Sequence, residues 1–308
     1  MSAAADVFAV ESPPLLRGES VGGRLARNPT VVFGVVILVL MCAMALAAPW
    51  LTNLDPSAIN PSFRNQTPGA VETVRADDGM KTEMRHWMGT DSLGRDVASR
   101  VVYGARASLI VGVSVAVVAV AIGLTIGLAA GYLRWLDSVV MRFMDGLMAI
   151  PAILLAIAVV SLSSAGLAAV IVAIVVPEVP RVVRLVRSVV LSVREEPYVE
   201  AAISVGTPTL PLVIRHILPN TLPPLIVQAT YICASAILIE AILSFLGVGI
   251  PPETPTWGNI MAEGRTLFRV YPHNILYPGV FLALTVLAVN LLGDGLRDTL
   301  DPRMRKRV

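Results

Sequence analysis

The sequence predicts an all-α integral membrane protein with six transmembrane helices, and three observations point to this fold. Of the 308 residues, 55% are hydrophobic and only 15% are charged, whereas soluble domains carry about 25% charged residues. Six mostly apolar stretches reach or approach the roughly 20 residues that a spanning helix needs. None of them alternates apolar and polar positions as a membrane β-barrel strand does. The predicted spans cover residues 31–50, 107–131, 138–161, 165–184, 222–247 and 275–293.

The first apolar stretch, residues 31–50, is interpreted as a retained span. It begins only after about 30 residues, whereas a cleavable signal peptide places a shorter apolar run closer to the start. The sequence from Ala45 to Pro49 resembles a cleavage site and is the feature that favours the alternative. We therefore expect residues 1–30 to precede the first membrane crossing.

The distribution of basic residues predicts that both termini lie in the cytoplasm, because cytoplasmic loops are enriched in Arg and Lys. With the N-terminus inside, most of the 24 basic residues fall on the cytoplasmic side. The others are concentrated in the long segment 51–106, and long segments count less in this rule. The predicted organisation is a cytoplasmic N-terminal segment (1–30), a first span (31–50), an extracytoplasmic segment (51–106), a transmembrane core (107–296) and a cytoplasmic tail (297–308).

The extracytoplasmic segment divides into two parts. Its first half is rich in Asn, Pro, Ser, Asp and Gly, which predicts irregular structure. Its second half reads HWMGTDSLGRDVASRVVYGARASL, in which Asp91 could cap a helix with Val97, Val101 and Val102 on its apolar face. Either a helix along the outer membrane surface or an ordinary polar loop fits this pattern.

Prolines interrupt two of the predicted spans. Pro151 lies within the third span, and Pro177 and Pro180 are expected to break the end of the fourth. Three basic residues then follow at helical spacing on one face: Arg181, Arg184 and Arg187. These arginines could meet lipid headgroups or a protein partner.

No catalytic site is predicted. A phosphate-binding loop requires glycine before its Lys-Thr pair, and Met80 stands there, so ATP hydrolysis by that mechanism is not expected. The three histidines lie in or beside loops and form no serine–histidine dyad at membrane depth. No Cys/His cluster has zinc spacing, and a formal charge of +2 gives no indication of nucleic acid. Neither a metal nor a cofactor is therefore expected.

Two carboxylates and a glycine pair stand out inside the predicted spans. Glu240 lies deep in the fifth span, where it could line a polar path or be hydrogen-bonded in helix packing. Asp145 lies near the inner end of the third span, where solvation or packing accounts for it. Gly123 and Gly127 form a GxxxG pattern, which predicts close helix approach in a packed bundle.

Residues 198–220, YVEAAISVGTPTLPLVIRHILPN, form a polar interruption between apolar runs. Pro197 follows two glutamates at a predicted helix start, and Gly206 is expected to end that helix. A second segment has Arg215 and His216 near its expected C-terminal end, closed by Pro219. The pattern predicts a short helix with a shallow surface. Either docking into a groove on a soluble partner or an ordinary interfacial turn fits it.

The same interruption resembles the EAA loop of ABC-importer permeases. The matching positions are Glu200, Ala201, Ala202, Gly206, His216 and Pro219. The segment HWMGTDSLGRDVASRVVYGARASL, the stretch EAILSFLGVGIPPETPTWGNIM and the tail GDGLRDTLDPR resemble the dipeptide, oligopeptide and nickel permease family, in particular the second of its two permeases. The resemblance covers about residues 20–305. Two departures are Trp87, where the family usually has proline, and a longer segment 51–83.

This resemblance implies a type I ABC importer permease-like bundle with a cytoplasmic coupling helix within about 195–220. It implies half of a heterodimeric pathway for peptides in the bacterial plasma membrane, surrounded by lipid. The implied partners are a sister permease, one or two ATP-binding subunits and an extracytoplasmic substrate-binding protein. Alternatives are nickel or another small solute as cargo, an ion-driven secondary transporter that uses Glu240, and a membrane-embedded enzyme.

Overall fold

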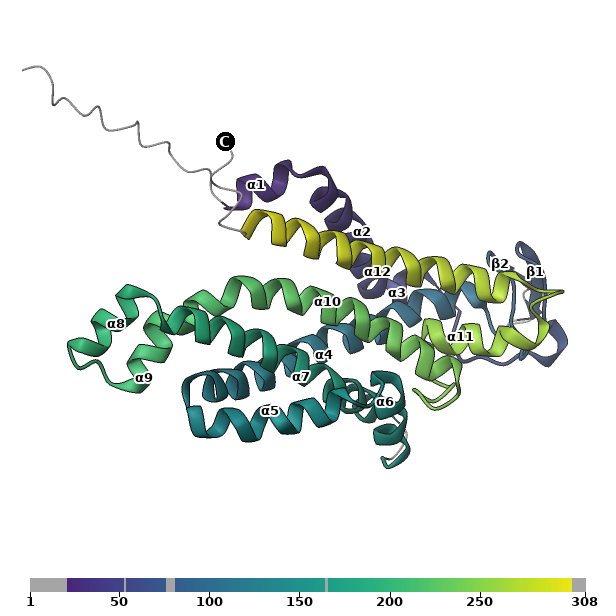
Figure 1. Cartoon of the computed structure of the whole chain (residues 1–308). Coiled ribbons are helices and arrows are strands. Elements are labelled where there is room, and N and C mark those ends of the chain that lie inside the picture. The colour runs from purple at the N-terminus through teal and green to yellow at the C-terminus, as the bar shows by residue number, and fades with distance from the viewer. Residues whose placement is uncertain (1–20, 53, 76–80, 164–165, 301–308) are drawn as a thin grey trace, which may run out of the picture.

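The computed structural model describes residues 21–52, 54–75, 81–163 and 166–300. Long helices run along an elongated molecule (Figure 1). One end, called here the hairpin end, carries the antiparallel strands β1 (Ala70–Arg75) and β2 (Lys81–His86) and helix α11 (Trp257–Gly264). The opposite end, called the α8–α9 end, carries α8 (Pro197–Ser204) and α9 (Thr209–Leu212).

The helices of the body pack in a continuous series. Helix α2 packs on α12, α12 on α10, α10 on both α4 and α7, and α7 on α5 and α6. The main apolar core lies among α4, α7 and α10. The remaining elements are α1 (Val21–Arg27), α2 (Pro29–Leu46), α3 (Ala48–Leu51), η1 (Pro61–Phe63), α4 (Val97–Tyr132), α5 (Arg134–Met148), α6 (Ala152–Ser161), α7 (Leu167–Arg194), η2 (Val213–Ile217), α10 (Leu218–Phe245), η3 (Arg265–Leu267) and α12 (His273–Leu300).

Within the described residues, four helices are long and apolar enough to cross a membrane: α2, α4, the continuous helix Thr209–Phe245 and α12. Helices α5 and α6 add a fifth if the bent pair is one span. Helix α7 covers the predicted fourth span but carries Glu178, Arg181 and Arg184 within it. The count of six spans therefore stays a prediction.

The predicted GxxxG contact is present between α4 and α7. A Cβ atom added at Gly123 would lie 2.4 Å from Cβ of Val182, and one added at Gly127 would lie 2.7 Å from Cβ of Val186. Gly131 faces Val190 in the same way. The glycines therefore let the two helix backbones approach closely, with a valine of α7 over each of them.

Gly127→Leu is expected to destabilise the protein, because the new side chain needs space that Val186 fills. Overpacking of this kind costs about 1–3 kcal/mol. Thermal denaturation in detergent should show a lower midpoint than in the wild type. The matched control is Ala121→Leu, which adds bulk at an exposed position of the same helix. Equal midpoints for the two variants would contradict the packing role of Gly127.

The prolines act differently from the prediction. Helix α7 continues unbroken through Pro177 and Pro180 up to Arg194, so these residues do not end it. The break lies instead at Pro151, where α5 and α6 meet at 90°. The predicted third span, 138–161, is therefore bent at Pro151, and its crossing of the membrane stays a prediction. Pro151 has no N–H to continue the helix of the preceding residues, and it begins α6 as its N-cap residue.

The segment before α4 is more ordered than predicted. Its first half contains the hairpin β1–β2, with Ala70 paired to His86, in place of a wholly irregular loop. The buried His86 ring contacts the carboxylates of Asp96 at 2.9 Å and Glu72 at 3.2 Å, which joins the hairpin to the start of α4. Asp96, rather than Asp91, caps α4 by accepting from the Ser99 N–H at 2.6 Å. Residues 97–132 form one helix without a separate surface helix.

Candidate functional site

Helix α8 forms where the sequence predicts a short helix. Glu196 occupies the N-cap position, and Pro197 follows in the first turn, where its missing N–H costs nothing. Gly206 ends the helix with φ of +80°, a left-handed conformation that favours glycine. The Gly206 and Thr207 N–H groups donate to the carbonyls of Ile203 and Ala202 at 2.9 and 3.1 Å. Local sequence signals therefore set both ends of this helix.

The base of α8 is joined to the helix that follows it. The Asn220 side-chain amide donates to the Tyr198 hydroxyl at 3.0 Å and to the His216 carbonyl at 2.7 Å. The rings of Tyr198 and His216 stack with centroids 6.5 Å apart. Val199, the next residue of α8, is fully buried. The structure thus brings the base of α8 next to His216. Pro219 lies three residues after His216 in the same helix.

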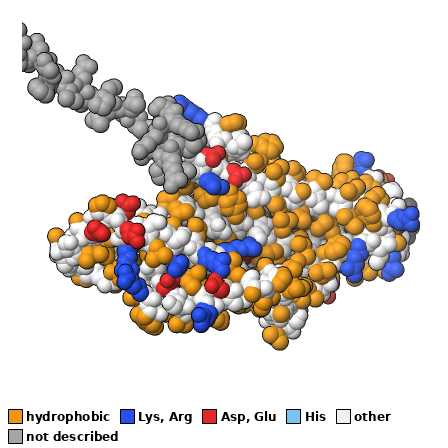
Figure 2. Space-filling view, in the orientation of Figure 1, with side chains coloured by type: hydrophobic (Ala, Val, Ile, Leu, Met, Phe, Trp, Pro, Cys, Tyr) orange, Lys and Arg blue, Asp and Glu red, His pale blue; other side chains and the backbone are white. Residues whose placement is uncertain are grey.

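The α8–α9 end exposes apolar side chains. Val205 is 82% exposed and Leu210 is 68% exposed, and Ile203 and Ile214 are exposed beside them. We call these four residues the tip patch. Glu200 is exposed on α8, and Figure 2 shows acidic side chains gathered near this end among hydrophobic ones. Clustered exposed apolar residues with a polar rim are typical of a surface that binds another protein.

The prediction that Arg215 and His216 lie near the C-terminal end of a helix is wrong. Helices α9, η2 and α10 form one continuous helix of 37 residues from Thr209 to Phe245. In η2 the chain forms a wider turn, and the Leu218 N–H donates to the carbonyl of Val213, five residues back. This π-type turn lies directly before Pro219, which has no N–H to donate, so the helix continues through the proline.

Glu240 lies inside the bundle between α10 and α4. It is fully buried, and its carboxylate accepts from Ser244 at 2.8 Å and from Ser108 of α4 at 3.3 Å. Of the two interpretations of Glu240, this geometry favours hydrogen bonding within helix packing.

The arginines of α7 have partners within the chain, which the sequence left open. Arg184 pairs with Asp145 of α5 at 2.5 Å, and Arg187 pairs with Asp137 of α5 at 2.7 Å. Arg181 pairs with Glu178 on its own helix. Figure 2 shows basic and acidic side chains gathered over the region of α5 and α7, with hydrophobic side chains around them.

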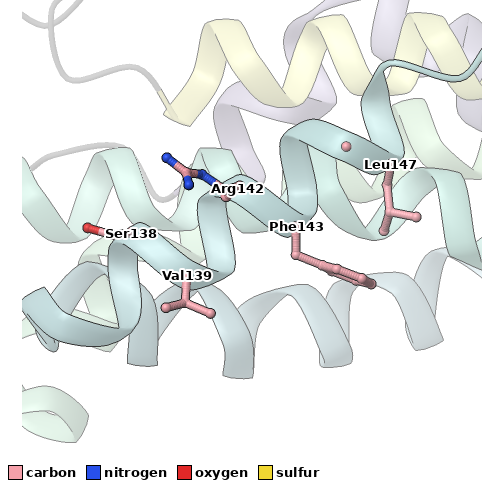
Figure 3. Close-up of a pocket in the computed structure, with 6 residues that line it drawn as sticks. Ser138, Val139, Arg142, Phe143 and Leu147 are labelled. Atoms are coloured by element: carbon pink, nitrogen blue, oxygen red, sulfur yellow. The ribbon is translucent and has the colours of Figure 1, made fainter.

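The outward face of α5 is divided by side-chain type. Val139, Phe143 and Leu147 extend from one side of the helix and Arg142 from the other (Figure 3). An open hollow of about 610 Å³ lies against these residues. An exposed apolar helix face beside charged residues is typical of a surface covered by lipid or by another protein.

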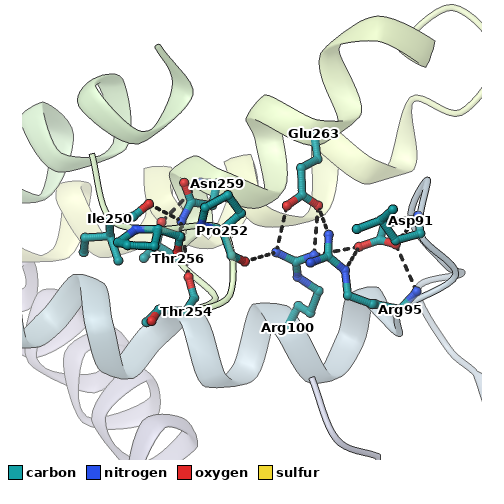
Figure 4. Close-up of polar contacts among 11 residues, drawn as sticks. Asp91, Arg95, Arg100, Ile250, Pro252, Thr254, Thr256, Asn259 and Glu263 are labelled. Carbon is teal, nitrogen blue, oxygen red and sulfur yellow. Dashed lines mark hydrogen bonds and ion pairs between the residues drawn. The ribbon is translucent and has the colours of Figure 1, made fainter. Parts of the chain in front are cut away.

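The hairpin end contains a buried ion-pair cluster that sequence analysis did not identify. Its members are Asp91, Arg95, Arg100 and Glu263, which we call the Arg100 cluster (Figure 4). Arg100 is 1% exposed and donates to Asp91 at 2.7 Å and to Glu263 at 2.8 Å. Arg95 contacts the same two carboxylates. The cluster therefore joins α4 to α11, which lies more than 150 residues later in the sequence.

Further polar contacts hold the turn beside this cluster. The Asn259 side-chain amide contacts the carbonyls of Ile250, Pro251 and Thr254 at 3.0 to 3.2 Å (Figure 4). Burial raises the pKa of the Glu263 carboxyl, while the guanidinium groups of Arg100 and Arg95 act against this rise. The charged form of Glu263 therefore depends on the two arginines.

Residues 95–306 match a family model described as the binding-protein-dependent transport system inner membrane component. The match covers more than half of the chain. The chain belongs to this transport permease family. Residues 20–68 of this permease also match the N-terminal transmembrane domain of oligopeptide transport permease C.

Curated relatives of the permease extend over nearly its whole length. A probable peptide ABC transporter permease of Sinorhizobium fredii is 52% identical over 282 residues, which cover 91% of each chain. A dipeptide transport system permease of Alkalihalophilus pseudofirmus is 41% identical over 92% of this chain and 88% of the relative. An inward-facing structure of the methionine ABC transporter MetNI aligns with a TM-score of 0.51 and 21% identity, over 66% of this chain and 96% of that one, which supports the fold.

Proposed function

We propose that this permease is a subunit of an ATP-driven importer of peptides and forms half of the translocation pathway. It takes the energy for transport from separate ATP-binding subunits. The observation that carries the proposal is the α8–α9 end, where a capped helix with the EAA residues presents exposed apolar side chains. The relatives named for peptide and dipeptide transport support the choice of cargo.

In this proposal the tip patch is the contact with an ATP-binding subunit. Val205, Leu210 and Ile214 offer apolar area, and the small Ala201 and Ala202 allow a partner surface to approach α8 closely. A short helix that inserts into a groove is a recurrent mode of protein recognition. The Tyr198 ring of α8 stacks on His216 of the long helix Thr209–Phe245. A displacement of α8 by its partner is therefore transmitted to that helix.

The remaining partners and the sidedness follow from the same assignment. The α8–α9 end and both termini lie in the cytoplasm, and the hairpin end lies outside, where a substrate-binding protein delivers the cargo. A sister permease completes the pathway. The abundance of arginine near the α8–α9 end supports this orientation.

Reconstitution tests the function directly. The subunit, its sister permease and their ATP-binding subunits are placed in proteoliposomes with the binding protein outside. We expect uptake of dipeptides that requires ATP inside. Uptake that follows an ion gradient without ATP-binding subunits would establish the secondary transporter instead.

Ser204→Cys tests the orientation, because Ser204 is exposed on α8. In a background with Cys42 and Cys233 replaced by alanine, a membrane-impermeant maleimide should label this cysteine only from the cytoplasmic side. Glu253→Cys, which is exposed near the hairpin end, is the matched control and should be labelled only from outside. The reverse pattern would invert the proposed topology.

Glu240→Gln is expected to leave ATP-driven uptake within about twofold of the wild type. Glutamine has nearly the same volume, and its amide oxygen can accept from one of the two serines while its NH2 group donates to the hydroxyl of the other. The measurement is initial uptake rate at several pH values, with Glu240→Leu as a variant that removes the hydrogen bonds. Loss of uptake in Glu240→Gln with normal assembly would assign Glu240 to an ion or proton path.

A further inference from the structure

Helix α7 contains a buried carboxylate, Glu178, among apolar side chains that could pack without it. Glu178 is fully buried, and its neighbours Pro177 and Val179 are buried as well. Its two oxygens accept from Nη1 of Arg181 at 3.0 and 3.1 Å. The Ser235 hydroxyl of α10 donates to the same carboxylate at 3.2 Å. Glu178 is thus fixed by α10 on one side and holds Arg181 on the other.

Arg181 is oriented but not enclosed. Its side chain is 46% exposed, although its partner Glu178 has no exposed surface. The Glu178 carboxylate accepts hydrogen bonds from one terminal nitrogen of Arg181, Nη1. The Nη2 and Nε groups of the same guanidinium can therefore donate to other acceptors. Arg184 lies three residues further along the same face, 44% exposed and paired with the exposed Asp145. This charged face is turned away from the core of the chain.

The predicted second span and the packing of α7 on α4 together put Arg181 at membrane depth. Val182 packs on Gly123 of α4, and the predicted second span extends from 107 to 131. With a rise of 1.5 Å per residue, Gly123 lies about 12 Å inside the end of that span. Arg181 precedes Val182 by one residue, so its exposed guanidinium lies at about the same depth. Val117 of α4, in the same span, is exposed as an ordinary apolar side chain.

A charged group at this depth is costly against lipid tails and normally faces a water-filled cavity or a protein partner. We propose that the α7 face that carries Arg181 borders the aqueous translocation path, and that Arg181 binds a carboxylate group of the passing solute. This inference rests on the proposed transport function and deepens it. Glu178 acts as the positioning residue, because it holds one edge of the guanidinium and leaves the other edge toward the path.

The chemistry of the site favours a carboxylate as ligand. A guanidinium presents parallel N–H donors that match the two oxygens of a carboxylate, and it stays charged at all physiological pH values. A peptide carries a carboxylate at its C-terminus whatever its side chains, so a single arginine can contact many peptides. Since Glu178 already compensates the charge of Arg181, the solute is held weakly enough to move on.

Cysteine labelling tests whether this face is aqueous. Arg181→Cys is made in the cysteine-free background, within the complete complex in proteoliposomes, and is treated with a water-soluble methanethiosulfonate reagent. Val117→Cys, at an exposed apolar position of α4, is the matched control. In at least one of two states, resting or nucleotide-trapped, the Arg181→Cys complex should react with the reagent at least about tenfold faster than the Val117→Cys complex. Equal slow rates in both states would overturn the proposal, since the face would then be covered by lipid or by the sister permease.

Transport tests the ligand. Complexes with Arg181→Gln and Arg181→Lys are supplied with an equimolar mixture of dipeptides, and uptake is followed by mass spectrometry. Loss of a charged hydrogen-bond donor predicts uptake about 10- to 100-fold slower for Arg181→Gln, with partial recovery in Arg181→Lys. Normal uptake in Arg181→Gln would overturn the carboxylate contact.

A second labelling variant and the independence of the two assays separate a folding defect, a wrong cargo and a wrong site. If Arg181→Cys does not assemble because Glu178 loses its partner, Arg184→Cys provides the labelling test on the same face, since its own partner Asp145 is solvent-exposed. If the wild-type complex imports no dipeptide, the proposed cargo fails. The labelling comparison still decides whether the face is aqueous.

Discussion

A complex with Gly206→Asp is expected to lose ATP-driven uptake and substrate-stimulated ATP hydrolysis, while the subunit still inserts and assembles with its sister. Gly206 ends α8 with φ of +80°, and a side chain there costs roughly 1–2 kcal/mol of backbone strain. The new carboxylate would also lie at a helix C-terminus, where negative charge is unfavourable. It would stand beside Val205 in the tip patch. Loss of one central contact in an interface predicts a decrease of roughly a hundredfold in coupled hydrolysis.

Gly247→Asp is the matched control. Gly247 has φ of +82° and open space around its Cα, as Gly206 has, but it lies at the hairpin end of the long helix. The two variants carry similar backbone strain and the same added charge. We expect Gly247→Asp to keep most of its coupled hydrolysis. If Gly206→Asp hydrolyses ATP and imports substrate normally, the docking role of α8 is wrong.

Arg100→Met is expected to destabilise the protein strongly. Arg100 is 1% exposed and joins Asp91 to Glu263, so its removal leaves these two largely buried carboxylates sharing the single positive charge of Arg95. Breaking a buried ion pair from one side costs about 3–5 kcal/mol. We expect the melting midpoint in detergent to fall by roughly 6–10 °C, and α11 to become accessible to proteases.

Arg106→Met provides the comparison, since Arg106 is exposed on the same helix. Its midpoint should stay close to that of the wild type. Arg100→Met combined with Glu263→Gln should recover part of the loss, because the single charge of Arg95 then faces one carboxylate instead of two. Equal midpoints for Arg100→Met and Arg106→Met would show that the Arg100 cluster does not hold α11 to α4.

Features that depend on neighbouring residues could be predicted from the sequence. Helix α8 is one, because a proline at its start and a glycine at its end act within a single turn. The contact of Gly123 and Gly127 is another, since glycine spacing on one helix indicates a close approach whatever the partner. The family follows from several motifs taken together, and the match over residues 95–306 confirms it.

Features that join distant segments could not be predicted in the same way. Glu263 lies 163 residues from Arg100, and no local pattern connects them. Arg184 and Asp145 are separated by 39 residues and a sharp bend, so their pairing depends on how α5 lies against α7. The effect of proline was also set by context, because neighbouring helices support α7 through Pro177 and Pro180 while the chain turns at Pro151.

The unbroken helix from Thr209 to Phe245 has a mechanical consequence. Its 37 residues make a rod about 55 Å long, which begins beside α8 and ends next to the turn held by Asn259. A rotation of such a rod by about ten degrees around one end moves the other end by about 10 Å. A tilt of this helix imposed at the α8–α9 end therefore becomes a displacement of several atomic diameters at the hairpin end. The backbone hydrogen bonds along the helix need not change.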